Sequence, residues 1–286
     1  MSYRLIKLNS GHTIPSIGLG CYDIPRNKTS ALVYEACKVG YRQFDTAVLY
    51  GNEEEVIEGI SKFLKDHPQV PRSEFFYTTK LWNNQLGTTN TKQAISTMLD
   101  QIGDLKYIDL LLIHSPLPGK ERRLESWKVM LDAVDKGFIK SIGVSNYGQH
   151  HVEELLNDDN IKIKPAVNQI EISPWCMRQE LASWCLDKGV NVEAYAPLTH
   201  GTKLQSLATR NKDFQQIAAK YHKTPAQILI KWSLQKGYIP LPKTKTESRL
   251  KENLAVDGFE LTQEEIELID QPDAYEPTDW ECTDAP

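Results

Sequence analysis

The sequence predicts a single α/β domain over residues 1–286, folded as an eight-stranded parallel (β/α)8 barrel, or TIM barrel. A chain of 286 residues suits one barrel of about 250 residues with short additions. Apolar runs alternate with amphipathic helical stretches, which indicates parallel strands joined by right-handed crossovers. Polar side chains end several predicted strands, and a closed barrel gathers such ends on one face, whereas an open sheet spreads them along a line. These strand-end residues are Asp45, Lys80, His114, Ser145 with Asn146, Gln169, Tyr195 and Lys243.

The expected elements follow one another in a regular order. Residues 5–8 and 13–17, joined by turn residues 9–12, have the pattern of a β-hairpin, and we expect it to cap the floor of the barrel. The clearest strands are 41–46, 74–80 and 107–114. The expected helical stretches are 29–40, 53–65, 91–101, 124–136, 152–157, 179–188 and 224–235.

The junction between the strand 41–46 and the next helix carries an acid and a phenol. Asn52 with Glu55 has the spacing of a capping box, in which an amide side chain bonds the first free helix N–H groups. Asp45 and Tyr50 are therefore expected on the exposed lip between strand and helix, where a barrel enzyme keeps its chemistry.

The C-terminal segment differs from the rest of the chain. Residues 271–282 contain prolines, acids and aromatic side chains but no basic residue. We expect an irregular C-terminal loop over the active-site face, with plain solvated surface as the alternative.

Composition excludes several classes of function. A net charge of −5 and a pI near 5.9 argue against a nucleic-acid-binding protein, which needs a basic face. The N-terminus lacks an apolar signal core, and no apolar stretch approaches the roughly 18 residues of a membrane helix, so we expect a cytoplasmic protein. The five cysteines are an odd number without a Cys-x-x-Cys pair, which favours reduced thiols, and no metal-ligand pattern is present.

Several separate motifs, in order along the chain, resemble one family. From residue 14 to the C-terminus the sequence is similar to the aldo-keto reductases, which are NADPH-dependent carbonyl reductases on a (β/α)8 barrel. The resemblance is specific because the motifs are independent of one another. They span residues 14–20, 40–53, the strand that ends at Lys80, 112–116, 142–147, 167–171 and 241–244.

Carbonyl reduction needs a hydride donor and an acid that protonates the oxygen. Tyr50 is the expected acid, and because a phenol ordinarily titrates near 10, the cation of Lys80 is needed beside it. Asp45 is the expected ion-pair partner that keeps a buried Lys80 charged. His114 is expected to bond the substrate oxygen as a neutral imidazole. The resemblance implies the same four catalytic residues.

The expected cofactor is NADPH. The glycines at 18–20 lack the third glycine and the helix start of a Rossmann fingerprint, so the dinucleotide must bind elsewhere. Barrels often bind phosphate after their last strands, and a cation, a hydroxyl and an arginine there suit a 2′-phosphate. The resemblance implies Lys243, Thr244 and Arg249 at the 2′-phosphate, Glu252 and Asn253 at the adenine, Ser145, Asn146 and Gln169 at the carboxamide, and Tyr195 stacked on the nicotinamide ring.

Four further residues, beside His114, are expected to face the substrate. They are Tyr22, Trp82, Ser115 and Trp280. Tyr22 and Ser115 stand where vertebrate members commonly have tryptophan, and the segment after His114 is short, as in fungal and bacterial members. These departures indicate a wider mouth than vertebrate members have.

The sequence therefore predicts an NADP-dependent reductase that converts aldehydes and ketones to alcohols. The compact form resembles fungal members that act on keto esters, dicarbonyls and reactive aldehydes. Two alternatives remain at this stage: an aldolase-like barrel with a Schiff base on Lys80, and a regulatory or sensor protein that binds NADPH with little turnover. The only partner expected is a small-molecule carbonyl substrate, and the family habit is a monomer or weak homodimer.

Overall fold

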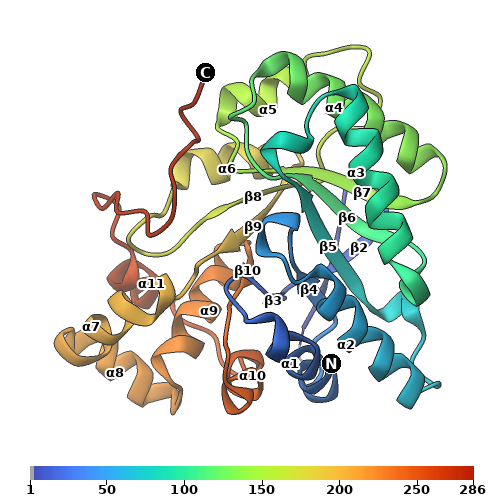
Figure 1. The fold of residues 1–286 in the computed structure, drawn as a ribbon. Coiled ribbons are helices and arrows are strands. Elements are labelled where there is room, and N and C mark those ends of the chain that lie inside the picture. The colour runs from blue at the N-terminus through green and yellow to red at the C-terminus, as the bar shows by residue number, and fades with distance from the viewer. Residues whose placement is uncertain (1–2) are drawn as a thin grey trace.

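Eight parallel strands form the centre of the molecule, and the computed structural model describes residues 3–286 (Figure 1). The strands are hydrogen-bonded in chain order from β3 to β10, and every described pair is parallel. This confirms the (β/α)8 architecture. The strands are β3 (Leu19–Gly20), β4 (Gln43–Asp45), β5 (Phe76–Leu81), β6 (Ile108–Ile113), β7 (Ile139–Ser145), β8 (Val167–Glu171), β9 (Asn191–Tyr195) and β10 (Ile239–Leu241).

A seam between β10 and β3 closes the barrel through backbone hydrogen bonds that all run from the β3 side to the β10 side. The backbone N–H of Gly18 donates to Pro240 O at 3.1 Å, and that of Gly20 donates to Pro242 O at 3.2 Å. The prolines cannot donate in return because they lack an N–H. A Cβ on Gly20 would lie 2.9 Å from Leu241 O, so glycine permits this close approach.

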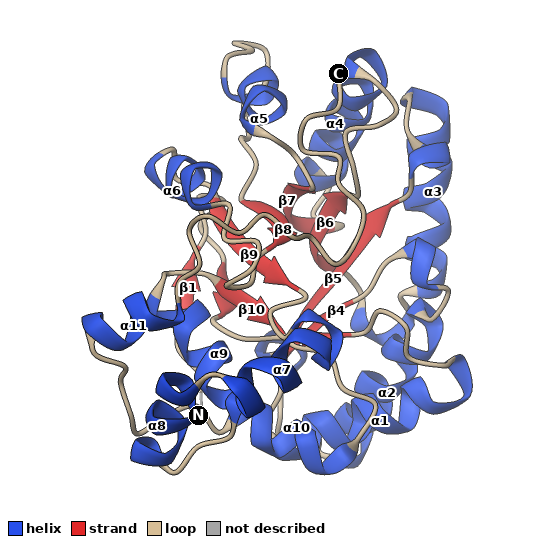
Figure 2. Ribbon diagram, turned by 90° about the vertical axis from the view of Figure 1, so that its left-hand side faces the viewer, coloured by secondary structure: helices blue, strands red, loops and turns tan. Residues whose placement is uncertain are grey.

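Helices surround the strands, as Figure 2 shows. All seven expected helical stretches are helical, and a helix also follows residues 241–244, as expected. Two consecutive helices before α9, and one near the C-terminus, were not expected. The helices are α1 (Arg26–Val39), α2 (Glu53–Asp66), α3 (Thr88–Gln101), α4 (Lys120–Asp135), α5 (Gln149–Leu156), α6 (Gln179–Asp187), α7 (Thr202–Arg210), α8 (Lys212–Tyr221), α9 (Pro225–Gln235), α10 (Glu247–Leu254) and α11 (Gln263–Ile269).

The expected N-terminal hairpin is a separate antiparallel sheet of β1 (Leu5–Lys7) and β2 (Thr13–Pro15). Its turn reaches the amino ends of the barrel strands, where Asn9 donates to Pro165 O at 2.8 Å and Ser10 bonds the Ser141 hydroxyl at 2.7 Å. Leu8 and Ile14 pack with interior barrel residues in a small apolar cluster. The hairpin therefore caps the floor of the barrel.

The prediction of a capping box at α2 is wrong. Asn52 is fully buried and makes no cap bond to the helix. Its amide instead donates to Cys21 O at 2.9 Å and Ile24 O at 3.3 Å, and its oxygen accepts from Thr46 at 2.7 Å. Asn52 thus joins three chain segments, because the loop after β3 lies against the start of α2.

The strand expected over 41–46 is also shorter than predicted. The N–H of Tyr41 donates to Ala36 O at 2.9 Å, so this residue completes the end of α1 rather than a sheet ladder. Only Gln43–Asp45 pair as β4.

The C-terminal segment crosses the mouth of the barrel and is held there by charged side chains (Figure 2). Glu171, at the end of β8, accepts from Thr278 N at 2.6 Å, Thr278 Oγ1 at 2.7 Å and Asp279 N at 3.1 Å. Arg178 pairs with Glu281 at 2.5 Å. The expected C-terminal loop over the active-site face is therefore present.

Candidate active site

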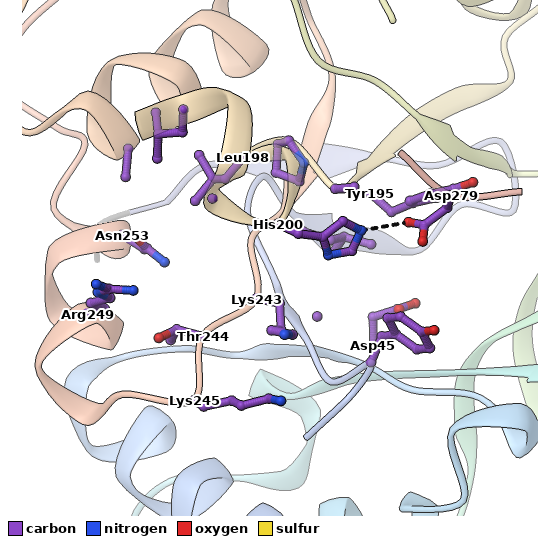
Figure 3. A pocket seen from close by; sticks show the side chains of 18 of the residues that line it. Asp45, Tyr195, Leu198, His200, Lys243, Thr244, Lys245, Arg249, Asn253 and Asp279 are labelled. Carbon is purple, nitrogen blue, oxygen red and sulfur yellow. Dashed lines mark hydrogen bonds and ion pairs between the residues drawn. The ribbon is translucent and has the colours of Figure 1, made fainter. Parts of the chain in front are cut away.

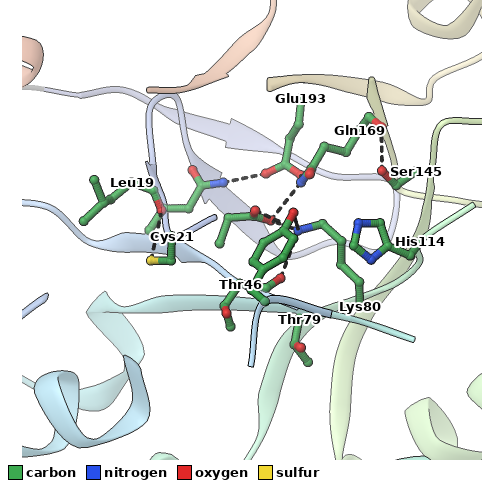
Figure 4. Close-up of polar contacts among 12 residues, drawn as sticks. Leu19, Cys21, Thr46, Thr79, Lys80, His114, Ser145, Gln169 and Glu193 are labelled. Atoms are coloured by element: carbon green, nitrogen blue, oxygen red, sulfur yellow. Dashed lines mark hydrogen bonds and ion pairs between the residues drawn. The ribbon is translucent and has the colours of Figure 1, made fainter. Parts of the chain in front are cut away.

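Lys80 contacts both Asp45 and Tyr50, and the Tyr50 ring faces that of His114. Figure 4 shows Lys80 and His114 at the ends of their strands. Lys80 Nζ donates to Asp45 Oδ1 at 2.7 Å, to Asp45 Oδ2 at 2.9 Å and to Thr46 O at 2.9 Å, and lies 3.2 Å from Tyr50 Oη. The rings of Tyr50 and His114 are edge to face, with centroids 5.6 Å apart. The four residues that the sequence predicted as a group are therefore in mutual contact.

The position of Lys80 bears on the aldolase alternative. Its side chain is fully buried beneath Tyr50, does not line the cavity, and its ammonium lies among four protein oxygens. A Schiff-base lysine must reach the substrate carbonyl through its nitrogen. The geometry is that of a buried counter-charge instead.

Burial sets the protonation of the two groups that face the cavity. Burial, with a smaller contribution from the Asp45 carboxylate, raises the pKa of Tyr50 well above its ordinary value. Burial, and then the Lys80 cation, lowers the pKa of His114 well below its ordinary value. Near neutral pH, Tyr50 therefore holds its proton and His114 is a neutral imidazole. The neutral imidazole was expected from the sequence, whereas the raised pKa of Tyr50 was not, because Lys80 was expected to make the phenol more acidic.

A second carboxylate lies beneath this group, and sequence reasoning missed it. Glu193 on β9 is fully buried and accepts from Gln43 Nε2 at 2.5 Å and Gln169 Nε2 at 2.9 Å. Gln169 Nε2 also donates to Asp45 Oδ2 at 2.8 Å, so both of its hydrogens face carboxylates. Burial, and then Asp45, raise the pKa of Glu193 to about 8. The sequence did contain a signal for Glu193: side chains two residues apart on a strand point to the same face, and Glu193 lies two residues before Tyr195.

One cavity of about 920 Å³ is lined by Tyr50 and His114 and by residues of α10. Figure 3 shows the part of it between Asp45, Lys243 and Arg249. It is large enough for a cofactor together with a small substrate. All nine residues expected to bind the cofactor line it: Ser145, Asn146, Gln169, Tyr195, Lys243, Thr244, Arg249, Glu252 and Asn253.

At one end of the cavity, the loop after β10 presents several cations. Lys243 and Lys245 both bond the Asp23 carboxylate, at 3.3 and 2.9 Å. Thr244 is buried, and its hydroxyl accepts from Thr246 N at 3.0 Å. The exposed Arg249 lies in the first turns of α10. This combination suits a phosphate dianion.

The part of this end where Glu252 and Asn253 lie, which was expected to bind the adenine, is braced by neighbouring helices. Glu252 accepts from the Thr224 hydroxyl at 2.8 Å, which links α10 to the start of α9. Asn253 is buried beside it. Both residues keep polar atoms next to the cavity while they stabilise the wall.

The middle of the cavity carries the residues expected at the nicotinamide. Tyr195 donates to Asn146 Oδ1 at 2.8 Å, and Asn146 Nδ2 donates to His114 O at 3.0 Å. Ser145 donates to Gln169 O at 2.8 Å. These bonds fix the direction of each side chain before any ligand binds, and Gln169 Oε1 has no protein donor within residues 3–286.

The substrate end is aromatic. Tyr22 lies 5.0 Å from Tyr50 between ring centroids, Trp82 lies 5.1 Å from His114, and Trp280 of the C-terminal segment lies 5.5 Å from Trp82. Tyr22, Trp82, His114 and Trp280 line the cavity, as expected, together with Leu49. Apolar walls of this kind exclude water from the reacting carbonyl.

Ser115 is the exception among the expected substrate residues. It is fully buried and does not line the cavity. Its hydroxyl donates to Asn83 Oδ1 at 2.7 Å, so it joins the loop after β6 to the loop after β5. The structure therefore removes Ser115 from the substrate-facing set.

A strap after β9, residues 198–208, covers part of the cavity and was not expected. Leu198, His200 and Leu204 contribute to the lining. Thr199 and His200 have positive φ angles of 47° and 52°, a conformation that no sequence pattern indicated. His200 bonds Asp279 at 3.1 Å, and Lys203 bonds Glu276 at 2.8 Å, so two ion pairs join the strap to the C-terminal segment.

Two kinds of feature, a membrane-spanning helix and a metal-binding cluster, are absent from residues 3–286. No helix in this part of the chain has the length and apolar character needed to cross a membrane. Nor does it contain a group of three or more His, Cys, Asp or Glu side chains that could hold a metal ion.

Comparisons with known proteins agree with this geometry. The aldo/keto reductase family description matches residues 16–274. An uncharacterized oxidoreductase of Saccharomyces cerevisiae is 58% identical over 284 residues, covering 99% of each chain. Methylglyoxal reductase DkgA of Escherichia coli K12 is 38% identical, covering 92% of this chain and 90% of the relative.

The fold of this chain is also similar to that of a solved structure. The aldo-keto reductase of Bombyx mori in complex with NADP has a TM-score of 0.85 and 33% identity, and the match covers 94% of this chain and 92% of that one. Aldo-keto reductases use NADP(H). On sequence and on structure, this chain belongs to the aldo/keto reductase family.

Proposed function

We propose that this chain is an NADPH-dependent carbonyl reductase that converts aldehydes and ketones to alcohols, with Tyr50 as the general acid. One observation carries the proposal: the proton-bearing Tyr50 and the neutral His114 face the same cavity as the cationic loop of Lys243. When bound, NADPH supplies the hydride for the carbonyl carbon.

The cavity residues fit this cofactor. Lys243, Thr244 and Arg249 offer two cations and a hydroxyl for a 2′-phosphate, which NADH lacks. Gln169 Oε1, with both Nε2 hydrogens already bonded, is left as an acceptor for the carboxamide N–H. Tyr195, fixed by Asn146, offers an aromatic face for the nicotinamide.

The remaining chemistry belongs to the protein. The neutral His114 orients the substrate oxygen by a hydrogen bond, and Tyr50 Oη gives it a proton as negative charge develops. The phenolate left on Tyr50 is stabilised by Lys80 Nζ at 3.2 Å. Asp45 holds that ammonium in place, so the positive charge is directed at Tyr50 before the reaction begins.

For the substrate we propose small carbonyl compounds, including dicarbonyls, keto esters and reactive aldehydes. The name of the Escherichia coli relative, methylglyoxal reductase, supports the dicarbonyl class. The aromatic walls of Tyr22, Trp82 and Trp280 support apolar carbonyl substrates.

The test is NADPH oxidation with methylglyoxal, keto esters and aromatic aldehydes, run in parallel with NADH. We expect turnover with NADPH, and Tyr50→Phe should lower kcat by about 100-fold or more. NADPH affinity, measured by fluorescence, should change little in that variant. Lys65→Met, at an exposed lysine outside the cavity, is the control. A folded wild-type protein that binds NADPH but turns over no carbonyl would contradict the proposal.

A further inference from the structure

The two lysines of the phosphate-binding loop already hold a carboxylate. One oxygen of Asp23, Oδ2, lies 2.9 Å from Lys245 Nζ and 3.3 Å from Lys243 Nζ. The hydrogen bond from Lys245 lowers the pKa of Asp23, so this side chain is an anion near neutral pH. A single carboxylate oxygen thus partly neutralises both ammonium groups.

This carboxylate comes from a different part of the barrel than the lysines do. Asp23 belongs to the turn between β3 and α1, whereas the lysines follow β10, so the contact crosses the seam. The backbone of Asp23 has a φ of 55°, in the left-handed region that aspartate tolerates better than most residues. The turn therefore directs an acid toward the loop that carries Thr244 and leads into α10 with Arg249. Figure 3 shows Thr244 and Arg249 together with the two lysines.

Arg249 differs from the lysines in this respect. It has no salt-bridge partner within residues 3–286, and its side chain lies on the exposed side of α10 next to the same cavity. The loop therefore offers an incoming phosphate one free cation and two that are shared with Asp23.

We propose that Asp23 is a built-in competitor for the 2′-phosphate and limits how strongly this protein prefers NADPH over NADH. The inference rests on the proposed function, which puts that phosphate at Lys243, Thr244 and Arg249. A phosphate dianion and the Asp23 carboxylate repel each other when they share an ammonium group, so binding requires Asp23 to give up at least one lysine. NADH has no 2′-phosphate and escapes most of this competition.

The test is the dissociation constant of NADPH and of NADH, measured by protein fluorescence at low and high salt. Asp23→Asn should bind NADPH about 3-fold to 10-fold more tightly than wild type at low salt, as expected for removing one charge at this range. NADH affinity should change much less, and high salt should reduce the difference. Asp104→Asn removes the same charge on an exposed turn at the opposite end of the barrel and should have no effect.

Three outcomes would overturn the inference. Unchanged or weaker NADPH binding in Asp23→Asn would mean that Asp23 orders the lysines rather than competes with phosphate. If Asp23→Asn binds NADPH and NADH more tightly by the same factor, Asp23 repels the pyrophosphate, which both cofactors carry, rather than the 2′-phosphate. The variant Arg249→Met distinguishes failure of the proposed function from failure of this inference alone, because Arg249 does not contact Asp23. If that variant keeps wild-type NADPH affinity, the phosphate site itself is misplaced, and the inference falls with it.

Discussion

Lys80 Nζ lies 3.2 Å from Tyr50 Oη while it holds both oxygens of Asp45 at 2.7 and 2.9 Å. The ammonium thus has a carboxylate as one partner and, as the other, a phenol that becomes anionic only when it gives up its proton. Because burial raises the pKa of Tyr50, the phenol in the proposed reaction keeps its proton until a stronger acceptor, the developing alkoxide, is beside it. The same ion pair fixes the position of the cation and tunes the acid.

Loss of Lys80 should affect stability as well as catalysis. Lys80→Met leaves Asp45 buried without its cation, and an unpaired buried charge costs about 3–5 kcal/mol of unfolding free energy. The double variant Asp45→Asn/Lys80→Met should be less destabilised than Lys80→Met, because it contains no unpaired charge. Urea denaturation checks both values. Equal or greater instability of the double variant would contradict the assignment of the loss to an unpaired carboxylate.

The closure of the strap should depend on pH through His200. The hydrogen bond to Asp279 raises the pKa of His200, with burial acting in the opposite direction and with Lys243 and Glu171 as the other nearby charges. The ion pair is therefore complete below the unfolded histidine pKa of about 6.5 and is lost as pH rises through the higher folded value.

Release of NADPH should accordingly become faster as pH rises through that range. Because exposed ion pairs contribute about 0.2–1 kcal/mol, we expect a change of no more than about 5-fold. Stopped-flow measurement of the dissociation rate constant checks this, and His200→Asn should remove the pH dependence. A wild-type rate that stays constant across the range would count against the His200–Asp279 link.

Glu171 should control the C-terminal segment. Glu171→Gln replaces one acceptor oxygen with an N–H₂ group that faces the donors of Thr278 and Asp279. The segment should loosen, so that KM for an aromatic aldehyde rises several-fold and chymotrypsin cleaves faster near Tyr275 and Trp280. Glu180→Gln on the exposed face of α6 is the matched control. Wild-type proteolysis in Glu171→Gln would show that other contacts hold the segment.

Asn52 should matter for stability rather than for helix initiation. Asn52→Ala removes its bonds to Cys21 O, Ile24 O and the Thr46 hydroxyl and leaves buried polar groups unsatisfied. We expect a loss of about 2–4 kcal/mol in unfolding free energy. Asn157→Ala, at an exposed position after α5, should change stability little. A loss below about 1 kcal/mol in Asn52→Ala, typical of a simple cap, would contradict the bridging role.

Strand ends were the most predictable part of the site. Asp45, Lys80 and His114 follow apolar runs, and parallel strands in a barrel bring such positions together whatever the details of packing. Tyr50 and the cationic loop at Lys243 could be predicted because each lies in a sequence motif that indicates a specific chemical role. These features depend on local sequence and on topology, which the chain pattern contains.

Contacts between loops were not predictable in the same way. The sequence spacing of Asn52 and Glu55 is the same whether the Asn52 amide caps its own helix or bonds the loop at Cys21. Only the packing of that loop against the start of α2 decides between the two. Ser115 directly follows His114 in the sequence, yet its hydroxyl bonds Asn83 behind the cavity. The strap depends on positive φ angles at Thr199 and His200, which are disfavoured locally and require tertiary contacts to persist.

The seam between β10 and β3 has a consequence for motion in the barrel. Its bonds run in one direction only, from Gly18 and Gly20 to Pro240 and Pro242, because the prolines have no N–H to donate in return. The loop proposed to bind phosphate begins immediately after Pro242, and the Asp23 turn begins just after Gly20. A ligand that spans both loops would fasten the joint from above. Amide hydrogens of Gly18 and Gly20 should then exchange with deuterium more slowly in the NADPH complex than in the free protein.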